Sequence, residues 1–335
     1  MNQIIKELNN NSSLSDSVLR QKYIEPPFSV LDTKLKFWKT RRDIWYKLNI
    51  QSELGRGDKY SGYSNYGDWI IKKGWTKNGN FKGQETKLKI SIFDPVLCEL
   101  MYEWFCPSNG KVLDPFAGGS VRGIVASIKG FDYCGIELNP EQVKSNREQA
   151  KQICTDNIPQ WIKGDSDKEL DKYVDSCDFV FSCPPYFDLE TYTDIDGDLS
   201  LLSDIDFLDK YESIISKSVS KLKDNRFACF VVGEVRSSKT GFYKNLVSNT
   251  IECFEKAGCH FYNDIVLLRP VANGAMRVPK QFPNYRKVVR IHQNVLIFYK
   301  GNNHRNIDGN IFHKGKEQSK LKGTLKPTKD IERFF

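Results

Sequence analysis

The sequence contains no run that approaches about 18 apolar residues, and it opens on the polar stretch Met1-Asn-Gln-Ile. A helix that spans a bilayer needs about 20 apolar residues, and a secretory signal peptide needs an apolar segment behind basic residues. Neither a membrane span nor a signal peptide is therefore predicted. The expected location is the cytoplasm.

A Cys-x-x-Cys pair is also missing, although the chain contains nine cysteines. Zinc sites and redox-active pairs use such close spacing, and an odd, scattered set of cysteines does not indicate a disulfide framework. We therefore expect free thiols in a reducing compartment, and we expect no metal site.

Positive charge is concentrated near the two ends of the chain. Residues 30–90 hold 14 Lys and Arg against 6 Asp and Glu, and residues 303–335 hold 8 against 4. Residues 91–302 hold 25 against 29. A mildly acidic body with basic ends indicates a polyanionic partner that binds outside the catalytic core. Ordinary lysines that keep the protein in solution would give the same counts.

With 335 residues the chain has room for one large domain with extensions. We expect a basic, aromatic-rich extension at 1–87, an α/β domain at 88–302 and a basic tail at 303–335. Within the extension, residues 1–29 are polar and indicate a mobile or weakly helical arm. The apolar spacing at 34–48 predicts an amphipathic helix.

The stretch 55–69 is rich in glycine and aromatic residues, and Lys72 and Lys73 follow it closely. Aromatic faces stack on bases and lysines contact phosphates, so this stretch is a candidate for nucleic-acid binding. A small subdomain with an aromatic core would have the same composition.

From about residue 88, short apolar segments alternate with amphipathic ones. This alternation is typical of an α/β fold with a doubly wound, mostly parallel sheet. Further helices are predicted at about 204–222 and 243–257. Strands are predicted at 111–116, 132–138, 160–164, 179–183, 226–233, 261–269 and 294–300. Because the last two strands are joined only by the polar loop 270–293, we expect them to pair antiparallel at the edge of the sheet.

A glycine turn and two acids mark the carboxyl ends of the first three strands. Gly118 and Gly119 follow the strand that contains Asp114, and Glu137 lies 23 residues after Asp114. Glycines let a ligand approach backbone N–H groups, and an acid at this spacing reaches ribose hydroxyls in nucleotide-binding α/β folds. Asp165 ends the third strand and could accept from an adenine amine. No Gly-Lys-Ser/Thr loop is present, so the expected ligand is a nucleoside rather than a pyrophosphate.

The strand at 179–183 is stopped by Pro184 and Pro185, and Tyr186 follows at once. Two prolines fix the backbone and remove two donors, which leaves carbonyl groups pointing beyond the sheet. Rigid acceptors beside an aromatic face suit a flat heterocycle that carries an exocyclic amine. A strand that simply ends in a Pro-Pro turn is the structural alternative.

Taken together, Asp114-Pro-Phe-Ala-Gly-Gly, Glu137, Asp165 and Ser182-Cys-Pro-Pro-Tyr resemble the S-adenosylmethionine-dependent DNA amino-methyltransferases, and the later strands look most like methylases of bacteriophages and prophages. The resemblance covers roughly residues 88–301. It implies a Rossmann-like class I methyltransferase sheet of seven strands with one reversed edge strand, S-adenosylmethionine as cofactor and double-stranded DNA with a flipped base as substrate. The cofactor-binding residues that it implies are Phe93, Asp94, Asp114, Phe116, Ala117, Gly118, Gly119, Glu137, Leu138, Asp165 and Ser166.

In the resembled family, the side chain before Pro-Pro and the carbonyl of the first proline hold the two amine hydrogens. Those positions here are Cys183 and Pro184, with Pro185 and Tyr186 completing the catalytic set and Ser182 as a possible helper. The family usually has Asp, Asn or Ser in place of Cys183, and sulfur is a weak acceptor. The departure leaves adenine N6 and cytosine N4 both open, and it raises a rival mechanism in which Cys183 attacks a pyrimidine carbon.

The segment that precedes the last strand is basic and could hold phosphates beside the flipped nucleotide. Its candidate residues are Arg277, Lys280, Arg286 and Lys287. An acidic loop from Asp188 to Asp198 either closes over the base or is a solvated surface loop. Alternative functions are methylation of an RNA or of a protein glutamine by the same device, and nucleic-acid binding without catalysis.

Overall fold

The structure is a computed structural model that describes residues 2–9, 17–51, 93–189, 193–271 and 274–312. The stretch 55–69, with Lys72 and Lys73 behind it, lies outside these residues, as does most of the basic tail.

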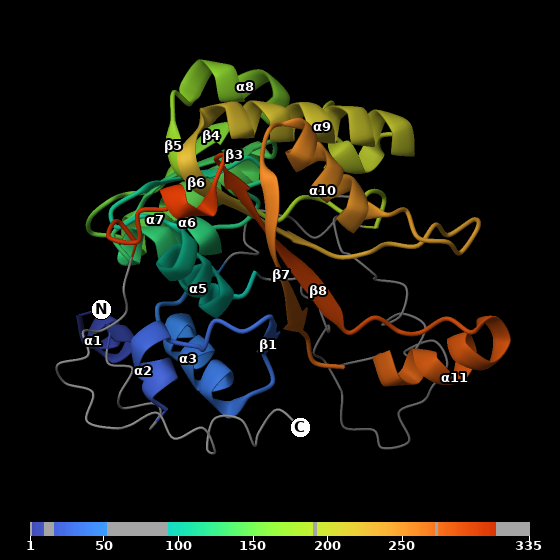
Figure 1. Ribbon diagram of the computed structural model, residues 1–335, viewed down its shortest axis with the longest axis horizontal. Helices are drawn as coiled ribbons and strands as arrows, with labels where there is room; N and C mark the ends of the chain where they lie inside the picture. The colour runs from blue at the N-terminus through green and yellow to red at the C-terminus, as the bar shows by residue number, and fades with distance from the viewer. Residues whose placement is uncertain (1, 10–16, 52–92, 190–192, 272–273, 313–335) are drawn as a thin grey trace.

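One eight-stranded sheet forms the centre of the fold, in the order β1-β7-β8-β6-β5-β2-β3-β4 (Figure 1). Among the described strands, only β8 runs antiparallel to its neighbours, β6 and β7. This arrangement confirms the predicted doubly wound, Rossmann-like α/β sheet with an antiparallel last strand. The strands are β1 (Val30–Asp32), β2 (Lys111–Asp114), β3 (Asp132–Glu137), β4 (Gln160–Lys163), β5 (Cys177–Ser182), β6 (Leu222–Val232), β7 (His260–Leu268) and β8 (His292–Lys300).

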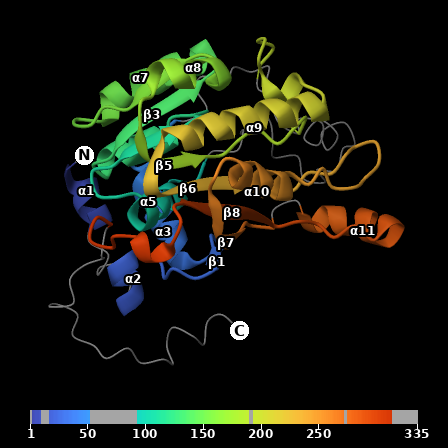
Figure 2. The same cartoon turned by 45° about the horizontal axis from the view of Figure 1, so that its top comes forward.

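Helices cover both faces of the sheet (Figure 2). Apolar side chains of α5, α6 and α7 pack on one face, and those of α8, α9 and α10 pack on the other. The helices are α1 (Asn2–Asn9), α2 (Val18–Tyr23), α3 (Lys36–Tyr46), α5 (Pro95–Phe105), α6 (Val121–Ile128), α7 (Pro140–Ile153), α8 (Ser166–Tyr173), α9 (Asp204–Lys221), α10 (Leu246–Lys256) and α11 (Gly274–Tyr285). None of the described helices is long and apolar enough to cross a membrane.

The connection between the last two strands differs from the prediction in two ways. It contains helix α11, which the sequence hid because Pro279 and Pro283 lie inside it and each removes a backbone donor. In addition, β8 lies between β6 and β7 rather than at the edge. The parallel strand β1 extends the sheet beyond β7, so the sheet has eight strands rather than the seven that the resemblance implied. Three residues carry too short a pattern to predict β1.

Helix α3 confirms the helix expected at 34–48 and ties the N-terminal region to the sheet domain. Trp38 and Trp45 are fully buried in the same apolar cluster as α5. The buried guanidinium of Arg41 donates to both carboxylate oxygens of Glu99 on α5, each at 2.7 Å. The Trp38 indole donates to Asp94 Oδ2 at 2.9 Å. The N-terminal helices therefore help to position the segment that the sequence assigned to the cofactor.

Candidate active site

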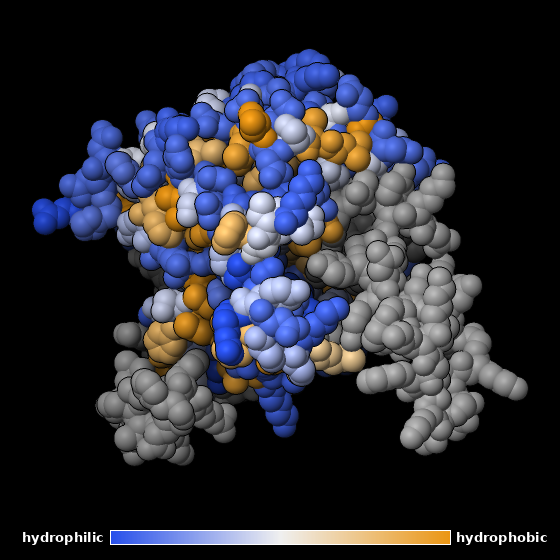
Figure 3. All heavy atoms as spheres, turned by 90° about the vertical axis from the view of Figure 1, so that its right-hand side faces the viewer, coloured by the Kyte–Doolittle hydropathy of each residue, from blue (hydrophilic) through white to orange (hydrophobic). Residues whose placement is uncertain are grey.

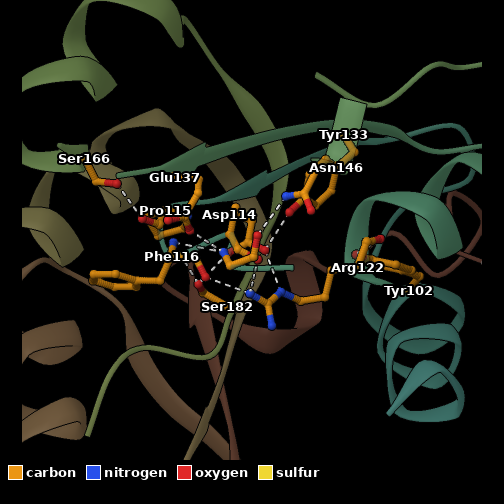
Figure 4. Close-up of polar contacts among 12 residues, drawn as sticks. Tyr102, Asp114, Pro115, Phe116, Arg122, Tyr133, Glu137, Asn146, Ser166 and Ser182 are labelled. Atoms are coloured by element: carbon orange, nitrogen blue, oxygen red, sulfur yellow. Dashed lines mark hydrogen bonds and ion pairs between the residues drawn. The ribbon is translucent and has the colours of Figure 1, made fainter. Parts of the chain in front are cut away.

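The predicted site residues gather at one edge of the sheet because β2, β3, β4, β5 and β6 run parallel and their carboxyl ends meet there. In open α/β sheets this edge is where ligands bind. Figure 4 shows side chains from β2, β3 and β5 and from α6 and α7 converging around the turn that follows β2.

The glycine turn is held from the neighbouring strand. Gly118 has φ +54°, in the left-handed region that glycine adopts at little cost. Its N–H donates to Glu137 Oε2 at 2.8 Å, and its carbonyl accepts from the Asn146 side chain on α7 at 2.8 Å. The second Glu137 oxygen accepts from the Asn139 N–H at 2.8 Å. The half-buried Glu137 carboxylate is therefore fixed in place beside the turn.

Asp114 is the centre of a buried network below the same turn. Its side chain is 0% exposed. It accepts from Arg122 Nε at 2.5 Å, from the Tyr133 hydroxyl at 2.7 Å and from the Ser182 hydroxyl at 2.5 Å. Burial and the nearby Asp114 carboxylate raise the pKa of Tyr133, so its hydroxyl stays protonated and donates. The Asp114 carboxylate is therefore held by groups of the protein itself, and its assignment to the cofactor stays a prediction.

Arg122 is the main residue of this site that the sequence analysis missed. Beyond Asp114, its guanidinium donates to the carbonyls of Phe116 at 2.7 Å and Ala117 at 2.8 Å, and it lies 4.6 Å from the centre of the Phe93 ring. Burial opposes its charge, but the adjacent Asp114 carboxylate raises its pKa above the ordinary range. The available signal was a charged residue within the otherwise apolar segment 121–128.

Ser182 connects the two halves of the site. It is fully buried, and its hydroxyl accepts from the Phe116 N–H at 3.1 Å while donating to Asp114. It therefore links the end of β5 to the glycine turn. The Ser182 proton is donated within the protein, and its role as a helper that holds the substrate amine stays a prediction.

Asp165 lies at the end of β4, as predicted, but its carboxylate already has partners. One oxygen accepts from the Asp167 N–H at 3.1 Å and so caps α8, and the other accepts from Lys210 Nζ at 2.8 Å. The same ammonium donates to the Gly197 carbonyl at 2.8 Å. Ser166 is turned toward the Pro115 carbonyl, to which it donates (Figure 4). A purine bound here would share Asp165 with Lys210.

The remaining residues of the predicted cofactor set are placed around the turn. Asp94 caps α5 by accepting from the Val96 N–H at 2.9 Å. The Phe93 ring packs edge-on against Phe181 at 5.7 Å, which brings the segment before α5 to the end of β5. Leu138 follows Glu137 and is half-buried.

The Pro-Pro turn follows β5, and its first residue, Pro184, is buried. Among the described residues, no donor is paired to the Pro184 carbonyl. Cys183 precedes it and is half-buried, with its sulfur 3.7 Å from the Tyr186 hydroxyl. Burial raises the pKa of the Cys183 thiol above its ordinary value, and Arg122 and the Tyr186 hydroxyl oppose this only in part. A neutral thiol is a poor nucleophile, which disfavours attack by Cys183 on a ring carbon.

Tyr186 is held at its hydroxyl end. The hydroxyl donates to the Val231 carbonyl at 3.2 Å and accepts from Gln293 Nε2 at 2.8 Å. A Cβ at Gly233 would lie 3.3 Å from the tyrosine ring, so the ring passes close over this backbone. The next residue, Phe187, has φ +52° and packs on Phe207 with ring centres 4.2 Å apart. Strained backbone of this kind persists where the surroundings fix it, and here the packing of Phe187 on Phe207 fixes the chain directly after the tyrosine.

Lys244 ties the segment after Tyr186 to the rest of the edge. Its ammonium pairs with Asp188 at 2.6 Å and with Asp204 at 2.7 Å, and it lies 4.8 Å from the Phe187 ring centre. The charge of Asp188, at the start of the acidic loop, is therefore neutralised by Lys244.

The predicted phosphate contacts lie on and behind α11. Arg277 and Lys280 are in the helix, and Arg286 and Lys287 follow it. No group of three or more potential ligands that could hold a metal ion occurs among the described residues.

No protein-family model and no curated protein matches the sequence. Solved structures with a similar fold include TrmN from Thermus thermophilus, with 13% identity and a TM-score of 0.41 over 62% of this chain and 49% of that chain. A methyltransferase from Pyrococcus furiosus has 14% identity and a TM-score of 0.41 over 72% of this chain and 100% of that chain. A putative DNA modification methylase, also from Thermus thermophilus, has 19% identity and a TM-score of 0.32 over 42% of this chain and 53% of that chain. Likenesses at these TM-scores assign no family, so the function must be inferred from the site itself.

Proposed function

We propose that this protein transfers a methyl group from S-adenosylmethionine to the exocyclic amine of a flipped DNA base, at adenine N6 or cytosine N4. The observation that carries the proposal is the end of β5, where the Pro184 carbonyl lies between Cys183 and the anchored Tyr186. Ser182 joins this turn directly to the glycine turn after β2. A methyl donor and an amine would therefore meet at one sheet edge.

The chain's own residues fit a nucleoside cofactor at the glycine turn. Gly118 takes the left-handed conformation without a Cβ that a ligand would meet. A Cβ at Gly135 would lie 2.8 Å from the Ala117 side chain, so the strand and the turn are tightly fitted. We assign Glu137 to the ribose hydroxyls, because two backbone N–H groups orient its carboxylate at the strand end. Asp165, shared with Lys210, is assigned to the adenine side.

The amine of a base is a poor nucleophile because its lone pair is delocalised into the ring. The Pro184 carbonyl would accept one amine hydrogen, and the Cys183 sulfur would be a weak acceptor for the other. Holding both hydrogens draws the nitrogen toward tetrahedral geometry and exposes its lone pair. The cofactor supplies an electrophilic methyl group on a sulfonium.

The atoms balance without a further reactant. A nitrogen–carbon bond forms as the sulfur–carbon bond breaks, the sulfonium becomes a neutral thioether, and the amine loses one proton to water. The protein's contribution is to bring two reactants into line, and misplacement by about 1 Å can cost about 100-fold in rate. The links from Ser182 to Asp114 and Phe116 fix that relative placement.

Tyr186 is assigned to stacking on the extracted base. Its hydroxyl is held by Val231 and Gln293, so the ring is positioned before a base arrives. Stacking of one base on an aromatic side chain is worth about 1–3 kcal/mol. Because the target lies inside a duplex, it must leave the stack to reach the Pro184 carbonyl.

Cofactor binding can be tested by calorimetry with S-adenosylmethionine. Glu137→Gln should weaken binding at least tenfold, and the exposed Glu141→Gln on α7 serves as the matched control. The substrate class can then be tested by supplying DNA, RNA and a glutamine-containing peptide separately with labelled cofactor. Label in RNA or peptide but not in DNA would overturn the DNA assignment, and no cofactor binding by the wild type would overturn the enzyme itself.

A further inference from the structure

Two segments at the active-site edge contain no acidic residue. Residues 235–251 carry three Lys and Arg, and residues 265–307 carry eight, without one Asp or Glu in either stretch. The first follows β6, and the second includes α11 and leads into β8. The loop between β6 and α10 and helix α11 project on the same side of the molecule in two views (Figures 1 and 2).

The first segment begins with an ordered hairpin, residues 235–244. Arg236 and Tyr243 form an antiparallel bridge, and the Lys244 N–H donates to the Val235 carbonyl at 2.8 Å. At the tip, the Ser237 N–H donates to the Phe242 carbonyl at 2.9 Å. The Arg236 guanidinium lies 3.7 Å from the centre of the Tyr243 ring. These contacts stiffen the hairpin.

Phe242 lies at this tip and is 75% exposed. Its neighbour Tyr243 contacts the Arg236 guanidinium and is 40% exposed. Single exposed apolar residues are common on protein surfaces, so the exposure of Phe242 becomes informative only together with the basic residues around it.

Helix α11 extends the surface around the hairpin. A Cβ at Gly241 would lie 2.5 Å from Lys287 Nζ, so the lysine ammonium rests directly on the hairpin tip. Exposed Met276, Phe282 and Tyr285 lie among the basic residues of α11. Figure 3 faces this side of the molecule and shows hydrophilic residues with small hydrophobic groups between them.

Most of the described basic side chains on this surface are not neutralised by a carboxylate. Within the described part of the chain, six of them form no ion pair with a carboxylate. They are Arg236, Lys239, Arg277, Lys280, Arg286 and Lys287. A surface on which basic residues alternate with exposed aromatic residues is typical of nucleic-acid binding.

The hairpin and β8, the strand that follows α11, each make a hydrogen bond to the segment 186–188. Lys244, at the base of the hairpin, pairs with Asp188, two residues after Tyr186. Gln293, in β8 behind α11, donates to the Tyr186 hydroxyl. The base of the hairpin and the start of β8 are therefore each linked to the segment that carries Tyr186, whose ring is assigned to the extracted base.

We propose that hairpin 235–244 enters a DNA duplex and that Phe242 inserts between base steps to fill the gap left by the extracted base, while α11 and Lys287 hold the flanking phosphates. The inference rests on the proposed function and adds the element that opens the duplex. Apolar wedges of this kind unstack base steps and kink a duplex. The surrounding basic charge favours DNA over a neutral protein surface.

The test is binding of the full-length protein to a pair of labelled duplexes of identical sequence, one intact and one with an abasic site at the centre. A gap in the stack accepts the phenyl ring without the cost of unstacking. We expect the wild type to prefer the abasic duplex by about tenfold, which corresponds to about 1.4 kcal/mol. Phe242→Ala should remove the preference and leave affinity for the intact duplex nearly unchanged.

Two control variants separate insertion from electrostatics and from general loss of exposed aromatic surface. Lys287→Ala should weaken binding to both duplexes equally. Tyr173→Ala removes a 60% exposed aromatic at the end of α8, on the opposite edge of the sheet, and should change neither. If Phe242→Ala keeps the full preference, insertion is wrong while the proposed function stands. If the wild type binds neither duplex, or prefers an RNA duplex, both the insertion and the DNA substrate are overturned.

Discussion

Replacement of Arg122 by Met tests whether the buried network below the glycine turn holds the site together. The side chain of Arg122 is 6% exposed and that of Asp114 is 0% exposed. Removing the guanidinium leaves a buried carboxylate with only neutral donors, which are the Tyr133 and Ser182 hydroxyls and the Phe116 N–H. Breaking a buried pair in this way costs about 3–5 kcal/mol, which is a large part of the 5–15 kcal/mol that stabilises a typical domain.

The substitution should also weaken cofactor binding. Two carbonyls of the turn, from Phe116 and Ala117, lose their donor in Arg122→Met. We therefore expect weaker binding of S-adenosylmethionine under conditions where the variant is still folded. Arg122→Lys retains the charge but not the forked geometry, so it should have intermediate stability and allow the binding measurement if the methionine variant unfolds.

Urea denaturation followed by circular dichroism measures the free energy of unfolding, and calorimetry measures the affinity for S-adenosylmethionine. The matched control is Arg226→Met, which removes a partly exposed pair with Asp178 at 3.4 Å and should cost less than about 1 kcal/mol. In the double variant Arg122→Met with Asp114→Asn, the loss should be smaller than the sum of the two single losses. Strictly additive losses, or an Arg122→Met loss no larger than that of Arg226→Met, would refute the reasoning.

Further outcomes follow from other parts of the chain. Burial alone would raise the pKa of Glu99, but Arg41 and Lys129 lower it from 4.5 to about 2. The Glu99 carboxylate should therefore contribute about 3 kcal/mol to the free energy of unfolding above pH 4.5, and this contribution should disappear as the pH falls toward 2. Urea titrations of Glu99→Gln should lack most of this pH dependence. Cys183→Ser should keep substantial methylation activity, whereas Tyr186→Ala should lose at least tenfold; a covalent adduct of Cys183 with fluorocytosine-containing DNA, detected by intact-mass spectrometry, would contradict the amine mechanism. DNA affinity should fall steeply with salt, and deletion of residues 303–335 should reduce the slope of log affinity against log salt; a flat dependence in the full-length protein would reject electrostatic binding.

The parts of the site that could be predicted from the sequence are those that local chemistry determines. Each can be recognised within a few residues of sequence: the left-handed Gly118, the Pro-Pro stop after a buried strand, and the acid at a strand end. Parallel strands then bring these features to one edge of the sheet.

The parts that were missed depend on pairs that are distant in sequence. Lys210 contacts Asp165 across 45 residues, and Lys244 contacts Asp188 across 56. Strand β1 is defined by its pairing with β7 rather than by its own three residues. Helix α11 has little buried surface, so its apolar pattern did not identify it against the contrary signal of two internal prolines.

The central claim is methyl transfer to a base amine, and nucleoside mass spectrometry tests it most directly. Unmodified DNA is incubated with the protein and S-adenosylmethionine that carries a deuterated methyl group, and the DNA is then digested to nucleosides. The account predicts deuterated N6-methyladenine or N4-methylcytosine with the wild type and much less with Tyr186→Ala. Deuterated methyl only on carbon 5 of cytosine, or no label in any base while the protein binds both cofactor and DNA, would contradict it.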